Sequence, residues 1–189
     1  MFTVPASFIG VFKVGDNINH SLLAASKLYE VQAVADHDAK VALAKPIIFL
    51  LASITEGLLF DLHFRLTHHT REGVKGIADS ITNYIRGKHI DDFSKYISSA
   101  KKHKLLGATN ADLYDRLEDL RKLRNRIHIQ NEKNHFEPDD GKAFSLDRQK
   151  GAEQILERVM KFCATNYHRD GAARNCVEDF NLPWSEHFP

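Results

Sequence analysis

The chain has 189 residues, of which 43% are hydrophobic and 27% charged, a composition typical of one soluble globular domain able to bury a core. Its formal net charge of +1 excludes a strong overall attraction to nucleic acid or membranes, so any such attraction has to be local. Five prolines and ten glycines favour helices over β-sandwiches, and we expect a single all-α domain over residues 1–189.

Apolar residues at steps of three and four predict helices along most of the chain. An arm over residues 1–14, with room for a short strand, is expected before them, and an irregular tail over residues 168–189 after them. Leu182, Trp184 and Phe188 indicate that part of this tail docks on the body. The expected helices cover residues 16–35, 41–66, 74–85, 91–106, 110–131 and 145–167, with loops between them.

The helix expected over residues 41–66 is the most hydrophobic and is therefore expected to be central. Pro46 has to lie in its first turn or to kink it. Glu56 is the one charge in its most apolar part, and we expect this carboxylate to be paired within the core.

The helix expected over residues 110–131 carries the most informative pattern. Taking Leu120 as the centre of its apolar stripe, Arg124 projects about 40° away, His128 about 80°, Arg121 about 100° and Asn125 about 140°. Two arginines, an asparagine and a histidine therefore share one flank. The apolar residues of the stripe are Leu113, Leu117, Leu120, Leu123 and Ile127.

This flank resembles the signature of the HEPN superfamily, in which an arginine, often followed by Asn, Asp or His, precedes a histidine on one helix by four to six intervening residues. Arg124 and Asn125 form the Arg-Asn pair, with three residues between Arg124 and His128, and Arg121 has six. The resemblance implies a HEPN-like helical bundle of about four main helices plus one or two shorter ones, and a homodimer formed through this helix. It also implies RNA as a partner, a role as a toxin or defence effector and a cognate protein antitoxin as a candidate partner.

The residue types on this flank suit RNA cleavage without a metal ion or cofactor. His128 can take the proton of a 2′-hydroxyl or protonate the leaving oxygen at neutral pH. Arg124 or Arg121 can hold the phosphate through its guanidinium, and Asn125 can orient the phosphate or the imidazole. The flank therefore predicts a metal-independent endoribonuclease or an RNA-binding protein.

A second interpretation belongs to a different functional class. The arginines can form a solvated basic face with salt bridges to residues such as Glu118. The same patch can then be the dimer or partner interface of a non-catalytic helical interaction module. The short spacing between Arg124 and His128 favours this alternative. For Glu56, an arginine of this flank is a candidate partner.

Neither a metal site nor a membrane segment is expected. His63, His68 and His69 are close in sequence but have no cysteines or carboxylates at ligand spacing. No stretch of about 18 apolar residues occurs, and the N-terminus lacks the basic region of a signal peptide. Cys163 lies on the apolar face of the last expected helix, and we expect it and Cys176 to be reduced thiols in a cytoplasmic protein.

Overall fold

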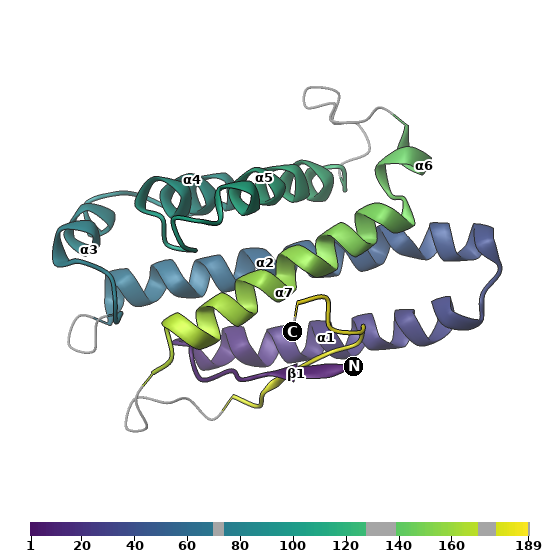
Figure 1. Ribbon diagram of the computed structural model, residues 1–189, viewed down its shortest axis with the longest axis horizontal. Coiled ribbons are helices and arrows are strands. Elements are labelled where there is room, and N and C mark those ends of the chain that lie inside the picture. The colour runs from purple at the N-terminus through teal and green to yellow at the C-terminus, as the bar shows by residue number, and fades with distance from the viewer. Residues whose placement is uncertain (70–73, 128–138, 170–176, 189) are drawn as a thin grey trace.

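The computed structural model describes residues 1–69, 74–127, 139–169 and 177–188, and its fold is all-α, as the sequence predicted (Figure 1). Two short strands accompany the helices and pair antiparallel, with Thr3 opposite Asn181, so the first and last strands of the described chain lie side by side. In chain order the elements are β1 (Phe2–Val4), α1 (Phe12–Val34), α2 (His37–His68), α3 (Asp79–Arg86), α4 (Phe93–His103), α5 (Ala111–Asn125), α6 (Asp140–Ala143), α7 (Leu146–Asn166) and β2 (Phe180–Leu182).

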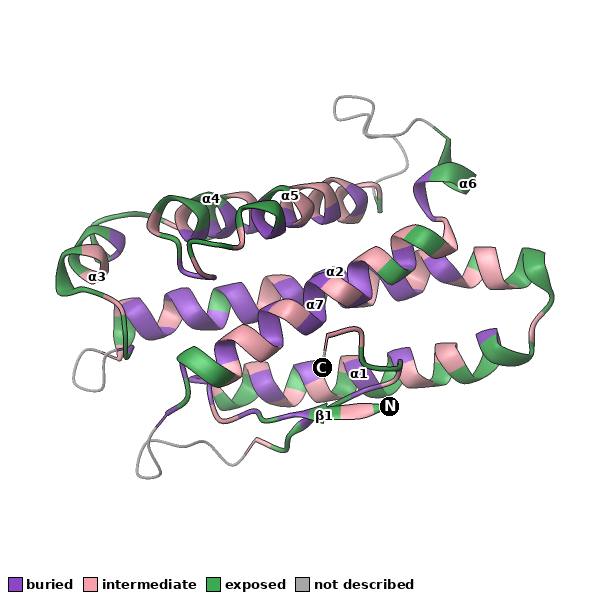
Figure 2. Cartoon of the chain, viewed as in Figure 1, coloured by how far each residue is buried: buried purple, intermediate pink, exposed green. Residues whose placement is uncertain are grey.

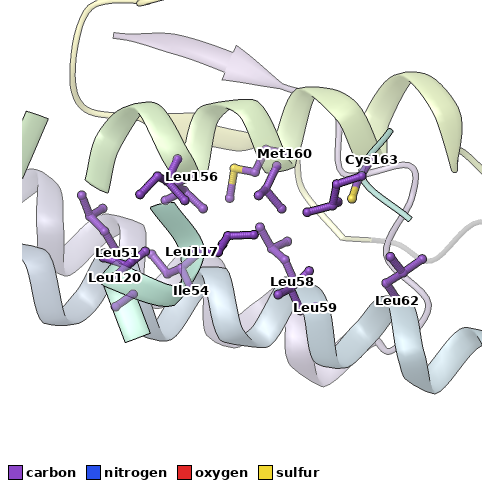
Figure 3. Packing of buried hydrophobic residues seen from close by; sticks show 14 of the residues in the cluster. Leu51, Ile54, Leu58, Leu59, Leu62, Leu117, Leu120, Leu156, Met160 and Cys163 are labelled. Carbon is purple, nitrogen blue, oxygen red and sulfur yellow. The ribbon is translucent and has the colours of Figure 1, made fainter. Parts of the chain in front are cut away.

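The central element is α2, as its hydrophobicity predicted. It contacts α1, α3, α4, α5 and α7, and its buried residues face the neighbouring helices (Figure 2). The close-up in Figure 3 shows leucines of α2 opposite Leu156, Met160 and Cys163 of α7, with side chains of α5 between them. Burying one such leucine contributes about 1.5–3 kcal/mol. Cys163 is part of this core, and burial raises the pKa of its thiol to about 12.

The start of α1 differs from the prediction, because the helix begins at Phe12 rather than at Asp16 or Asn17. The arm expected over residues 1–14 is shorter for the same reason. Asp61, a buried residue of α2, accepts hydrogen bonds from the backbone N–H groups of Gly10 (2.9 Å) and Val11 (2.8 Å). A carboxylate from another helix therefore fixes the chain where α1 begins, and no local sequence signal reveals it.

Next to Asp61, Arg65 is the largest fully buried side chain and is 2% exposed. Its guanidinium donates hydrogen bonds to the carbonyl oxygens of Phe8 and Tyr167, both at 2.7 Å. A Cβ at Gly10 would lie 2.4 Å from Cγ of Arg65, so the arm approaches α2 at a distance that only glycine allows. Arg65 thereby ties the N-terminal arm and the end of α7 to the central helix.

The helix α2 also begins earlier than expected, at His37, because the side chain of Asp36 caps it by accepting a hydrogen bond from the Ala39 N–H (2.9 Å). Pro46 consequently lies inside the helix rather than in its first turn. Proline cannot donate to the carbonyl one turn before it, here that of Ala42. Because Ala42 is exposed, water can reach this carbonyl.

Three other boundaries correct the prediction. The region expected to be helical from residue 74 forms α3 only from Asp79, since Gly76 takes a positive φ of 78°. The loop expected over residues 132–144 contains α6, capped by Asp139. The tail expected to be irregular contains β2, which needs a partner strand from the opposite end of the chain.

The last residues of the described chain dock on α7, as the sequence predicted. Glu157 of α7 is fully buried and accepts hydrogen bonds from the backbone N–H of Phe188 (2.8 Å) and the indole N–H of Trp184 (3.3 Å). Trp184 is buried and its ring packs against Tyr29 of α1. The tail therefore covers the α1–α7 side of the bundle.

A buried histidine lies where α2 meets α4. His63 is 3% exposed, and its ring packs against Tyr96 at a centroid distance of 5.1 Å. Its Nδ1–H donates to the carbonyl of Leu59 (2.7 Å), which leaves the Nε2 lone pair, and that atom has no hydrogen-bond partner within the described residues. Burial lowers the pKa of His63 to about 4.

This histidine makes the stability of the protein sensitive to acid. The pKa of His63 in the folded protein lies below that of the unfolded chain, so stability is complete above about pH 6.5 and falls as the pH drops towards 4. Replacing His63 by leucine should remove this part of the pH dependence, worth about 1.4 kcal/mol per unit of pKa shift. Urea unfolding at several pH values measures it. The matched control is His37→Leu, an exposed histidine of the same helix, and a His63→Leu slope equal to that of the control would contradict the assignment.

Candidate functional site

Four of the five residues of the predicted apolar stripe are buried, whereas Ile127, which follows α5, is 55% exposed. Leu113, Leu117, Leu120 and Leu123 are all 5% exposed or less. Asn110 occupies the N-cap position but does not cap the helix, because its side-chain amide donates to the carbonyl of Leu106 (2.7 Å). Packing on α2 and α7, rather than capping, therefore fixes this helix.

The other end of α5 corrects the prediction. The helix was expected to continue to residue 131, but it ends at Asn125. The N–H groups of Arg126 and Ile127 then donate to carbonyls three residues back, which tightens the chain into a turn. The angular position assigned to His128 assumed that the helix continues to residue 131. His128 itself lies outside the described residues.

Arg124 connects the end of α5 to the central helix. Its Nη2 atom lies 2.9 Å from Oε2 of Glu56, and the two side chains are 37% and 24% exposed. The expected partner of Glu56, an arginine of this flank, is thereby confirmed. The Nη1 atom also donates to Oδ1 of Asn125 at 3.4 Å. These two bonds use only part of the guanidinium, which has five N–H donors, and the rest can bind an anion.

Arg121 has a different environment, because its partner is on its own helix. Its Nε atom donates to Oε2 of Glu118 (2.9 Å), and a second, shorter bond joins Nη2 to Oε1. This two-point contact is the Glu118 salt bridge that the alternative interpretation named. The hydrogen bond from Arg121 also holds the pKa of the Glu118 carboxyl below its usual range. Because its side chain is 18% exposed, against 37% for Arg124, Arg121 is less accessible to a ligand than Arg124.

A third cluster was not predicted from the sequence. Asp140 of α6 accepts a hydrogen bond from Lys45 of α2 (2.8 Å) and binds Arg126, which follows α5. Arg126 and Asp140 stand just before and just after the segment 128–138, so its two ends are held together. The contact between α2 and α6 joins residues that are 95 positions apart in the sequence, and no local pattern indicates it.

Beside this site, one side of α2 is only partly covered: Val14 and Ile18 of α1 lie near Gly57, and Tyr96 of α4 packs on Phe60. We call it the open face of α2: Pro46, Leu50, Ser53, Gly57, Phe60 and Phe64, which follow one another at steps of three and four. None of these residues is buried, Phe60 is 36% exposed, and none carries a charge. Because Glu56 precedes Gly57 on the helix, the Arg124–Glu56 pair borders this face.

The exposure of this face is notable because α2 is so apolar. By length and composition it could cross a membrane, a property it shares with core helices of soluble proteins, and half of its most apolar part is buried within the protein. The remaining apolar surface is a candidate for contact with another molecule.

The described residues contain no group of three or more His, Cys, Asp or Glu side chains that could hold a metal ion. Among the described residues, the site offers the guanidinium of Arg124 and the amide of Asn125. No family model, curated protein or solved structure matches the chain. The function has to be inferred from the residues themselves.

The two arginine pairs should differ in how they contribute to stability. A double-mutant cycle on Arg124 and Glu56, with alanine at either or both positions, should give a coupling free energy of about 0.5–1 kcal/mol, because the pair is half-buried and joins two helices. The Arg121–Glu118 cycle serves as the comparison and should give about 0.3–0.5 kcal/mol, as for pairs within one helix. Urea unfolding gives both values, and a zero coupling for Arg124 and Glu56 would show that the contact is not formed in solution.

Proposed function

We propose that this protein is a homodimeric, metal-independent endoribonuclease or RNA-binding protein of the HEPN-like type. The observation that carries the proposal is Arg124: a half-exposed guanidinium at the end of α5, oriented by Glu56 and followed by Asn125. A carboxylate that holds one edge of a guanidinium fixes its direction, and the remaining N–H groups can bind two phosphate oxygens.

Each site residue has a distinct role in this proposal. Arg124 holds the scissile phosphate and stabilises the charge that develops on it. Asn125 orients the phosphate, and His128 transfers the proton. Arg121 contributes less, since its side chain is less exposed than that of Arg124.

The resemblance implies a dimer through the helix of Arg124; we propose that the open face of α2, which the Arg124–Glu56 pair borders, forms its interface. From Pro46 to Phe64 this face extends about 27 Å along the helix axis, and an uncharged apolar strip of that length is costly to leave in water. A second copy can cover it symmetrically, because a two-fold axis pairs a surface with itself. The Arg124–Glu56 pairs of both copies would then border one interface, and each copy could supply a histidine to a shared site.

One observation favours a second candidate, a non-catalytic helical interaction module. Arg121, Arg124 and Arg126 each have a carboxylate partner, so their charges are largely balanced within the chain. In this alternative the open face of α2 binds another protein, and the ion pairs form a polar rim around it. Cleavage assays and oligomeric state together distinguish the two.

The first test is catalytic. Arg124→Ala and His128→Ala should each reduce the cleavage of labelled RNA by at least about a hundredfold, whereas Arg121→Ala should be milder. Cleavage by the wild type should persist in EDTA. Folding of each variant is checked by circular dichroism. Activity that depends on added magnesium, or an inactive Arg121→Ala beside an active Arg124→Ala, would overturn the assigned roles.

The second test concerns the dimer. Ser53 is exposed at the centre of the open face, so Ser53→Glu should leave the fold intact while placing a like charge from each copy at the interface. We expect the wild type to be a dimer by light scattering, and this variant to be a monomer with reduced cleavage. Leu23→Glu, at an exposed leucine on α1, is the control and should remain dimeric. A Ser53→Glu protein that stays dimeric would place the interface elsewhere.

A further inference from the structure

An exposed tyrosine surrounded by cations lies where α3 meets the end of α4. Tyr84 of α3 is 42% exposed. Nζ of Lys102 lies 4.0 Å from its ring centroid and donates a hydrogen bond to its hydroxyl (2.6 Å), and Nζ of Lys88 lies 5.4 Å from the centroid. We call Tyr84, Lys88 and Lys102 the Tyr84 surface.

The charges of this surface are not balanced by acids. In the described parts of the chain, neither Lys88 nor Lys102 has a carboxylate partner, although the hydrogen bond from Lys102 holds the pKa of Tyr84 below its usual range. Many cations elsewhere on the described surface are paired: Lys13 with Asp16, Lys27 with Glu30, Lys95 with Asp91, Lys101 with Asp115 and Arg158 with Asp112. On a chain with a net charge of +1, this corner therefore attracts anions locally.

The tyrosine is also held in place by its neighbours. The ring of His103 packs beside it at a centroid distance of 5.1 Å and an angle of 56°. Ile85, the next residue on α3, is fully buried. An exposed aromatic ring on a fixed helix loses little conformational freedom when a flat ligand stacks on it.

We propose that the Tyr84 surface binds single-stranded RNA, with one base stacked on Tyr84 and the neighbouring phosphates on Lys88 and Lys102. Every base has a flat π-face, and aromatic rings beside cations are the usual way to bind single strands without reading their sequence. Exposed cation–π contacts are weak, so Lys102 can leave the ring for a phosphate when a base arrives. The inference rests on the proposed function and assigns to it a binding surface away from Arg124.

The position of this surface along α4 fits such a role. The opposite end of α4 faces the candidate site, since Asp92 interacts electrostatically with Arg121, and Tyr96 with Glu56. From Tyr96 to His103 the helix rises about 10 Å. A strand bound at Tyr84 can therefore continue along α4 to Arg124 within a few nucleotides.

The experiment measures binding of fluorescent 2′-O-methyl oligouridine, which lacks the hydroxyl needed for cleavage, by anisotropy at several salt concentrations. Tyr84→Leu should weaken binding at least about fivefold, and Tyr84→Phe should not, because phenylalanine keeps the stacking face. The Lys88→Ala/Lys102→Ala double variant should reduce the slope of log affinity against log salt by about 1.4, or 0.7 for each lost phosphate contact. Lys13→Ala/Lys27→Ala on α1 is the matched control and should bind like the wild type.

The results separate this inference from the proposed function. If the wild type cleaves RNA and the Tyr84 and lysine variants bind as tightly as the control, the RNA follows another path and the inference fails alone. If the wild type neither binds nor cleaves RNA, both fail. Competition by polyaspartate that is as strong as by RNA, and equally sensitive to Tyr84→Leu, would assign the surface to an acidic protein instead.

Discussion

The buried charges of α2 hold this fold together. Asp61 and Arg65 lie one turn apart on the most apolar helix, and between them they bind backbone groups of the N-terminal arm and of Tyr167 after α7. Asp61 interacts electrostatically with Arg65 and Arg169, and removing Asp61 would leave the Arg65 guanidinium buried without this carboxylate, a change that typically costs about 3–5 kcal/mol. The hydrophobic core supplies the driving force for folding. These two side chains determine where α1 starts and where the chain turns after α7.

This dependence on distant partners explains which parts of the structure the sequence predicted. The all-α class, the central position of α2, the buried leucines of α5 and the core thiol Cys163 all follow from periodicity, because an apolar stripe has to be buried. The start of α1, the presence of α6 and the strand in the tail depend on Asp61, on Asp139 and on β1. Helix ends are decided by a few hydrogen bonds, and here most of those bonds come from tertiary or capping partners.

At the candidate site, too, some contacts were predictable from the sequence and others were not. The Arg124–Glu56 contact was predictable because a charge in an apolar helix needs a partner and few cations were in reach. The Arg121–Glu118 pair was predictable from spacing alone. The Lys45–Asp140–Arg126 cluster was not, since it joins elements with no shared pattern. The expected helix over residues 110–131 was too long, because α5 ends at Asn125, and the prediction for His128 lies outside the described residues.

The pairing of β1 with β2 has a consequence for how the chain is made. Proteins are synthesised from the N-terminus, so Phe2–Val4 has no strand partner until residues 180–182 have been synthesised. Contacts of such high sequence separation are also among the slowest to form. The helices can pack before that point, but the tail residue Trp184, which is bound by Glu157 and packs on Tyr29, is synthesised after all of them. Completion of this fold therefore waits for the synthesis of β2, and a chain cut short before β2 keeps an unpaired edge.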